Sequence, residues 1–241
     1  MFNVLDIFSG IGGFSLGLER AGGFKTVGFC EVDAYCQQVL RKHWPKVPIY
    51  EDVRELNADT LSRDGITVDV IAGGFPCQDL SYAGNGAGLN GLRSGLWHEY
   101  CRLIRELRPD YVIVENVSAL LGRGLGTVLG NLATLGYDAE WQCIRATAVG
   151  LPHSRDRVWI VAYPNGLRKL QPLWSFCDFG GWVLHPFQGA VWPLPDCARD
   201  GNAYGISAAM DALGNAVVPG IPERIGCAIK SFAKSESAGK P

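Results

Sequence analysis

The feature that most constrains the fold is a regular alternation of short apolar strands and amphipathic helices. Residues 3–9 (NVLDIFS) have the composition of a buried strand, and a glycine loop (GIGG) follows them. The next segment, FSLGLERAG, has helical spacing and stops at Gly22 and Gly23. A second strand, KTVGFCEVD, and a second helix, AYCQQVLRKHW, repeat the pattern. Such alternation predicts an α/β fold built on a doubly wound parallel sheet.

The pattern continues to about residue 163 and then changes. The segments VDVIAGG and DYVIVENV are predicted strands, LWHEYCRLIREL is a predicted helix, and DAEWQCIRA with RDRVWIVAY forms a predicted hairpin. Residues 163–206 are rich in Trp, Pro and Gly without a clean period, and helical apolar sequence returns from 207. We therefore predict a main domain of residues 1–162 plus 207–241, a small irregular region at 163–206, and a frayed tail (AKSESAGKP).

Composition excludes several classes of protein. The chain has 241 residues, 47% of them hydrophobic, and a net charge of −2, which suits one globular domain with a small appendage. No apolar stretch approaches the ~18 residues of a membrane span, and the N-terminus shows no signal-peptide pattern. Eight cysteines without a CxxC pair argue against structural zinc and disulfides. We expect a cytoplasmic monomer with no metal and no membrane association.

The glycine loop between the first strand and helix is a candidate cofactor site. Free backbone N–H groups at a helix N-terminus bind anions and nucleotides, and Glu31, at the end of the next strand, can accept both ribose hydroxyls. This arrangement fits NAD and S-adenosylmethionine alike. The dinucleotide fingerprint needs a glycine at position 15, where this chain has serine, and Asp52 supplies a further acid. Tight strand–helix packing is the alternative explanation for the glycines.

A second candidate site lies in GGFPCQDLS, where Cys77 follows the end of a strand on a turn shaped by Pro76 and two glycines. A thiol in this position becomes a nucleophile when its pKa is lowered. The alternative is an inert core cysteine, and we assign that role to the other thiols considered. These are Cys30, Cys36, Cys101, Cys143 and Cys227.

Charged side chains at the ends of two later strands complete the pattern. Glu115 in ENV follows an apolar run, so it is either a structural hydrogen-bond acceptor or a carboxyl held protonated as a donor. Arg155 and Arg157 in GLPHSRDRVWIV point the same way by strand period. A solvated edge is the alternative for these arginines.

The sequence resembles the DNA (cytosine-5) methyltransferase family. The matching segments are DIFSGIGGFSLGLERAG, GGFPCQDLS, ENV, GLPHSRDRVWIV and ALGNAVVPGIPERIG, in the family's order. The resemblance implies a Rossmann-like sheet with the last helices packed beside the first strand, and a short target-recognition region at 163–206. It also implies methyl transfer from S-adenosylmethionine to a flipped cytosine in double-stranded DNA, with a cognate restriction endonuclease as a candidate partner.

The resemblance assigns roles residue by residue. Cys77 is the nucleophile, Glu115 contacts cytosine N3, Arg157 contacts O2, and Arg155 helps to shape the pocket. The resemblance assigns the other residues to binding either the cofactor or DNA. For the cofactor they are Phe8, Gly10, Ile11, Gly12, Glu31, Asp52, Pro76 and Asn215, and for DNA they are Gln78, Ser81 and Arg93.

Three alternatives remain at the level of sequence. The same catalytic set serves tRNA cytosine methylation in one branch of the family. A non-catalytic DNA-binding relative is disfavoured because Cys77, Glu115, Arg155 and Arg157 are all present. An NAD-dependent dehydrogenase is disfavoured by Ser15 and would leave Cys77 without a role.

Overall fold

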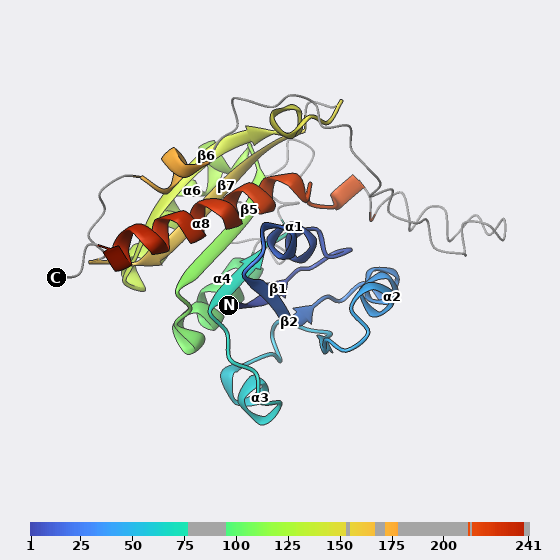
Figure 1. Ribbon diagram of the computed structural model, residues 1–241. Coiled ribbons are helices and arrows are strands. Elements are labelled where there is room, and N and C mark those ends of the chain that lie inside the picture. Colours follow the sequence, from blue (N-terminus) through green and yellow to red (C-terminus); the bar gives the residue numbers. More distant parts are fainter. Residues whose placement is uncertain (77–94, 153–154, 167–171, 178–211, 213, 239–241) are drawn as a thin grey trace.

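The computed structural model describes residues 1–76, 95–152, 155–166, 172–177, 212 and 214–238. Within these ranges the chain forms one seven-stranded sheet in the order β3-β2-β1-β4-β5-β7-β6 (Figure 1). The strands are β1 (Phe2–Ile7), β2 (Phe24–Cys30), β3 (Ile49–Tyr50), β4 (Val70–Gly73), β5 (Tyr111–Val117), β6 (Tyr137–Arg145) and β7 (Asp156–Pro164).

The sheet is parallel except at one side. Strands β1 to β5 run parallel to one another, as the alternation of strands and helices predicts. Strand β7 runs antiparallel to both β5 and β6, so the predicted hairpin is confirmed and the sheet is mixed at this side. The reason is the short connection between β6 and β7, which has no room for the crossover that parallel strands need.

Helices cover both faces of the sheet. One core layer joins the sheet to α4 and α6, around Trp97 and Leu132, and the other joins it to α1 and α8, around Phe14 and Ile225. The helices are α1 (Gly13–Ala21), α2 (Ala34–His43), α3 (Ala58–Arg63), α4 (Leu96–Leu107), α5 (Leu120–Arg123), α6 (Leu125–Thr134) and α8 (Gly220–Ala238), with the 3-10 turns η2 (Ala146–Val149) and η3 (Leu173–Phe176).

The last helix, α8, packs on the first helix, α1, and its core residues share a cluster with Val4 of the first strand (Figure 1). A Cβ added at Gly17 would lie 2.2 Å from the carbonyl oxygen of Pro219, and one at Gly226 would lie 2.8 Å from Cβ of Ala21. Backbone therefore approaches backbone at Gly17, and the α8 backbone lies directly against α1 side chains at Gly226, because neither glycine has a side chain to hold the two segments apart. This contact places the segment before α8 above the start of α1.

Three expectations about local structure need correction. The tail predicted to fray is helical to Ala238, because alanine, lysine and glutamate favour a helix. Cys227 is exposed on α8, not buried, since it lies on the outer side of that helix between buried neighbours. The helix α3 was not predicted, although Asn57 caps it by accepting a hydrogen bond from the Thr60 N–H (2.9 Å).

Among the residues described here, no helix is long and apolar enough to cross a membrane. These residues also contain no group of three or more His, Cys, Asp or Glu side chains that could hold a metal ion.

Candidate active site

The candidate site residues gather at one edge of the sheet. The carboxyl ends of β1, β2, β4 and β5 meet there, because these strands are parallel. The start of β7 reaches the same edge because β7 is antiparallel, and Arg157 pairs in register with Val117 at the end of β5. The arginines are therefore found at the beginning of a strand, whereas the other candidate groups follow or close one.

The glycine loop is hydrogen-bonded directly to Glu31. The Glu31 carboxylate accepts hydrogen bonds from the backbone N–H of Gly10 (2.6 Å) and of Asp33 (2.8 Å). Burial raises the pKa of Glu31, and these backbone hydrogen bonds oppose the shift. Glu31 thus fixes the loop as well as presenting a carboxylate beside it.

The loop is open above Gly10, which leaves room for a ligand. Gly10 and Gly12 have φ of +53° and +84°, a region that favours glycine, and a Cβ at Gly10 would meet no atom within 4 Å. A Cβ at Gly12 would instead lie 2.7 Å from the Trp44 ring. Open space beside a half-buried carboxylate fits a nucleoside with free ribose hydroxyls.

The other cofactor candidates have different environments. Phe8 adopts φ +54° at the end of β1, and its ring lies 6.4 Å from that of Tyr100. Ile11 is buried against α2, while Pro76 is half-buried after β4. Asp52 is engaged elsewhere, since its carboxylate accepts hydrogen bonds from Arg54, which lower its pKa. Asp52 must leave or share that pairing to contact a ligand.

Glu115 lies in a buried ion-pair cluster with the two predicted arginines. It is 8% exposed, and its Oε1 lies 3.0 Å from Nε of Arg157 and 3.9 Å from Nη2 of Arg155. Burial raises the pKa of Glu115 although both guanidiniums favour the charged form. The carboxyl is therefore poised to hold a proton more readily than an ordinary glutamate, as a proton donor requires.

Arg155 also contacts the C-terminal segment. Its guanidinium donates hydrogen bonds to the carbonyl oxygens of Gly214 and Asn215, the latter at 3.1 Å. Burial and the neighbouring Arg157 lower the pKa of Arg155. Asn215, a predicted cofactor residue, is thus joined to Glu115 through one side chain.

Asn116, which the sequence analysis missed, holds the turn before Cys77 together with Gly74, one of the two glycines expected to shape it. The Asn116 amide donates to the carbonyl oxygen of Phe75 (3.1 Å), and it is buried. A Cβ at Gly74 would lie 2.8 Å from Oε2 of Glu115, so only glycine lets the turn approach that carboxyl. The sequence did contain a signal for Asn116, because this residue is the middle one of the ENV segment that was singled out for Glu115.

Four of the predicted site residues lie outside the described part of the chain. They are the predicted nucleophile Cys77 and the predicted DNA contacts Gln78, Ser81 and Arg93. Their roles remain predictions.

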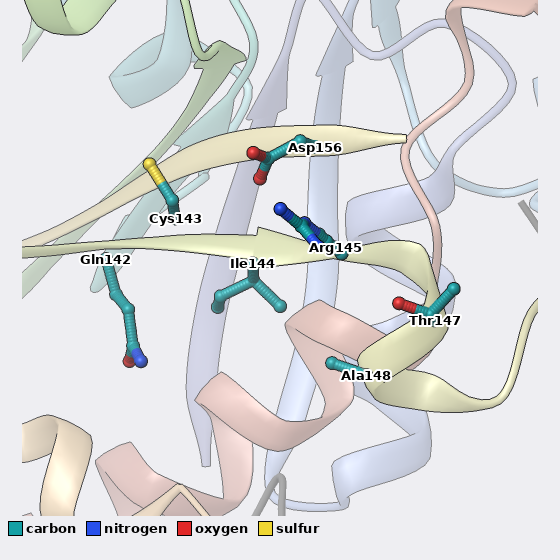
Figure 2. Close-up of a pocket in the computed structure, with 7 residues that line it drawn as sticks. All are labelled: Gln142, Cys143, Ile144, Arg145, Thr147, Ala148 and Asp156. Carbon is teal, nitrogen blue, oxygen red and sulfur yellow. The ribbon is translucent and has the colours of Figure 1, made fainter. Parts of the chain in front are cut away.

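A surface pocket of about 420 Å³ lies between β6, β7 and η2 (Figure 2). It is lined by Gln142, Cys143, Ile144, Arg145, Thr147, Ala148 and Asp156. Of the predicted site residues that the structure describes, none lines this pocket, although Asp156 lies between the two arginines in sequence. The pocket is therefore separate from the candidate active site.

The fold and the site together define the class of protein. A seven-stranded mixed sheet with β7 antiparallel, a glycine loop after β1 and an acid after β2 is the methyltransferase arrangement. The chain belongs to the C-5 cytosine-specific DNA methylase family, whose model matches residues 2–177. This family uses S-adenosylmethionine.

Curated relatives and solved structures agree with this assignment. The chain is 38% identical over 167 residues to the type II methyltransferase M2.BsuMI of Bacillus subtilis, covering 66% of this chain and 41% of that protein. It is 39% identical over 173 residues to M.Eco47II of Escherichia coli, covering 69% and 40%. The chain thus spans about two fifths of the length of these relatives.

Two solved structures share the fold. One is described as a DNA modification methyltransferase encoded within an E. coli prophage, with a TM-score of 0.62, 28% identity, and coverage of 73% of this chain and 50% of that one. The other is the S. pombe Dnmt2 methyltransferase, with a TM-score of 0.61, 19% identity, and coverage of 76% and 57%. The second, at this identity, bears on the fold alone.

Proposed function

We propose that this chain carries the catalytic site of a DNA (cytosine-5) methyltransferase acting on a flipped cytosine in double-stranded DNA. The observation that carries the proposal is the buried Glu115, 3.0 Å from Arg157 and against the Gly74 turn that leads to Cys77. A proton donor and a guanidinium next to the turn that precedes Cys77 in the chain support this chemistry, and the family membership supports the same chemistry.

The cofactor would lie over the glycine loop. We propose that Glu31 receives the ribose hydroxyls, with Phe8 against the adenine and the backbone of Gly10 to Gly12 near the methionine end. S-adenosylmethionine, when bound, supplies an electrophilic methyl group. Asp52, Pro76 and Asn215 remain candidates for the edge of this pocket.

The reaction requires cytosine C5 to become electron-rich. In the proposed mechanism the Cys77 thiolate adds to C6, and negative charge then develops on N3 and O2 of the ring. Glu115 donates a proton to N3, and Arg157 donates a hydrogen bond to O2. After the methyl group has been transferred, water takes the C5 proton, the C6–S bond breaks to release the Cys77 thiolate, and N3 returns its proton to Glu115.

The remaining parts of the proposal concern partners and organisation. We propose residues 1–162 plus 207–241 as the catalytic and cofactor-binding domain, and 163–206 as the target-recognition region. The type II names of the relatives support a cognate restriction endonuclease as a partner. Bacterial DNA lies in the cytoplasm, so a DNA substrate also implies a cytoplasmic site of action.

The proposed mechanism predicts a covalent intermediate through Cys77. A duplex containing 5-fluorocytosine cannot lose its C5 substituent as a proton, so protein and DNA should remain joined when S-adenosylmethionine is present. The adduct should survive denaturing electrophoresis and should be absent for Cys77→Ser, while Cys227→Ser should still form it. An adduct with Cys77→Ser would exclude Cys77 as the nucleophile, and methyl transfer to tRNA but not to duplex DNA would contradict the proposed substrate.

The cofactor assignment predicts a loss of affinity in Glu31→Ala. The variant should bind S-adenosylmethionine about 1.5–3 kcal/mol more weakly, the scale of a hydrogen bond to a charged group. Part of the loss would come from the Gly10 N–H, which Glu31 also accepts. Isothermal titration calorimetry measures the change, with Glu51→Ala, an exposed carboxylate after β3, as the matched control. Equal affinities for the two variants would remove Glu31 from the pocket.

A further inference from the structure

Asp6 is a fully buried carboxyl inside β1, and it bonds to the start of α1. Its Oδ2 accepts hydrogen bonds from the Ser15 hydroxyl (2.7 Å) and from the Ser15 backbone N–H (3.2 Å). Its Oδ1 is buried and has no hydrogen-bond partner among the described residues. Only one of its two oxygens is therefore used, and both bonds go to one residue.

This contact supplies a cap that α1 otherwise lacks. Gly12 is the N-cap residue and has no side chain to accept the free N–H groups of the first turn. Ser15 is the third helical residue, and the backbone N–H at this position normally donates a hydrogen bond to the side chain of the N-cap residue. Asp6 takes that place from the neighbouring strand, because the left-handed backbone at Gly12 requires glycine.

The same residue also holds the other end of the glycine loop. The Asp6 carbonyl oxygen accepts a hydrogen bond from the Ser9 hydroxyl (2.6 Å). Residues 9 and 15 are thus both attached to Asp6, one through its backbone and one through its side chain. Between these attachments lies Gly10, whose N–H points to the Glu31 carboxylate.

Burying a carboxyl group of which one oxygen accepts no hydrogen bond destabilises the folded protein. Burial raises the pKa of Asp6 to about 8, with the Ser15 hydrogen bonds opposing and the nearby Glu31 and Glu19 adding to the rise. An apolar side chain at this position would avoid the desolvation cost altogether. The carboxyl therefore contributes something that packing cannot, which is an acceptor for Ser15.

We propose that Asp6 is a positioning residue for cofactor binding: it holds residues 9–15 in the conformation that presents the Gly10 backbone. The inference rests on the proposed function, since the loop is the proposed cofactor site. Without this acceptor the loop samples other conformations, and the ligand must restore the ordered one at the expense of its affinity. In the sequence analysis Ser15 served only as evidence against a dinucleotide fingerprint. It now has a role of its own, as the hydrogen-bond partner of Asp6.

The test is a set of variants titrated calorimetrically with S-adenosylhomocysteine, well below each thermal midpoint. Asp6→Ala should bind about tenfold more weakly, the factor that corresponds to the loss of roughly one buried hydrogen bond. Asp6→Asn should stay close to the wild-type affinity, because its amide oxygen can accept both Ser15 bonds. Ser15→Ala should weaken binding, and adding it to Asp6→Ala should weaken binding little further, since the two side chains act together.

The matched control is Thr26→Val on β2. Thr26 is 2% exposed, and its hydroxyl has no hydrogen-bond partner among the described residues. This variant alters a buried polar group away from the loop, so its affinity should equal that of the wild type. If Asp6→Ala loses stability yet binds as tightly as Thr26→Val, Asp6 is only structural and the inference is wrong. A wild-type protein that fails to bind S-adenosylhomocysteine would contradict the proposed function and this inference together.

Discussion

Glu115→Gln is expected to lower the rate of methyl transfer to duplex DNA by about 10²–10⁴-fold, the usual contribution of a positioned general acid. The amide keeps the shape of the side chain and can still accept the Arg157 hydrogen bond, but it cannot deliver a proton to N3. Single-turnover transfer of a labelled methyl group measures the loss. The thermal midpoint, recorded separately, shows whether the variant remains folded.

A matched control is available on α4. Glu99 also pairs with an arginine, at 2.8 Å from Arg102, and it is not part of the candidate site. Glu99→Gln should leave the rate unchanged. The pH profile gives a second readout, because the raised pKa of Glu115 keeps it protonated to higher pH than an ordinary glutamate. In the wild type, activity should fall as the pH rises through the pKa of Glu115. A Glu115→Gln variant with normal activity would contradict the assignment of Glu115 as the proton donor.

Gly17→Val is expected to destabilise the protein by about 3 kcal/mol or more, since forced overpacking against a rigid backbone lies at the upper end of such effects. A Cβ at this position would lie 2.2 Å from the Pro219 carbonyl oxygen and 3.0 Å from the Glu223 N, so backbone must move. In a domain of this size a loss of that magnitude lowers the thermal midpoint by roughly 6–12 °C.

The control for this prediction is the same substitution on another helix. Gly130 lies on α6, is exposed, and would place a Cβ within 4 Å of no atom. Valine and glycine differ by less than about 0.5 kcal/mol in helix propensity, so Gly130→Val should leave the unfolding free energy nearly unchanged. Similar midpoints for the two variants would mean that α1 and α8 are not in contact as described.

Much of the fold and part of the site could be predicted from sequence because they follow from periodic patterns. Apolar strands and amphipathic helices give the order of elements, and the rule that parallel strands end at one edge places Glu31 and Glu115 at the same edge of the sheet. The two-residue period of β-structure likewise predicts that Arg155 and Arg157 share a face, and both lie within 4 Å of Glu115.

The remainder could not be predicted because it depends on contacts between side chains and distant backbone. Arg155 donates to the carbonyls of Gly214 and Asn215, and Asn116 donates to that of Phe75. A carbonyl is present at every residue, so the sequence carries no mark of which one is used. The pairing of Asp6 with Ser15 is hidden in the same way, since a buried carboxyl in a strand looks like an interruption of the pattern.

The contact between α1 and α8 has a consequence for how the protein is made. Residue 17 meets residues 219–223, so a ribosome must add some two hundred residues before this face of the sheet can be covered. Until then Phe14, Leu18 and Ile113, all buried in the finished structure, remain exposed on the growing chain. Exposed apolar surface of this kind is prone to aggregate, and native contacts of high sequence separation form slowly. Slower-growing cells or chaperone binding should therefore raise the yield of folded protein.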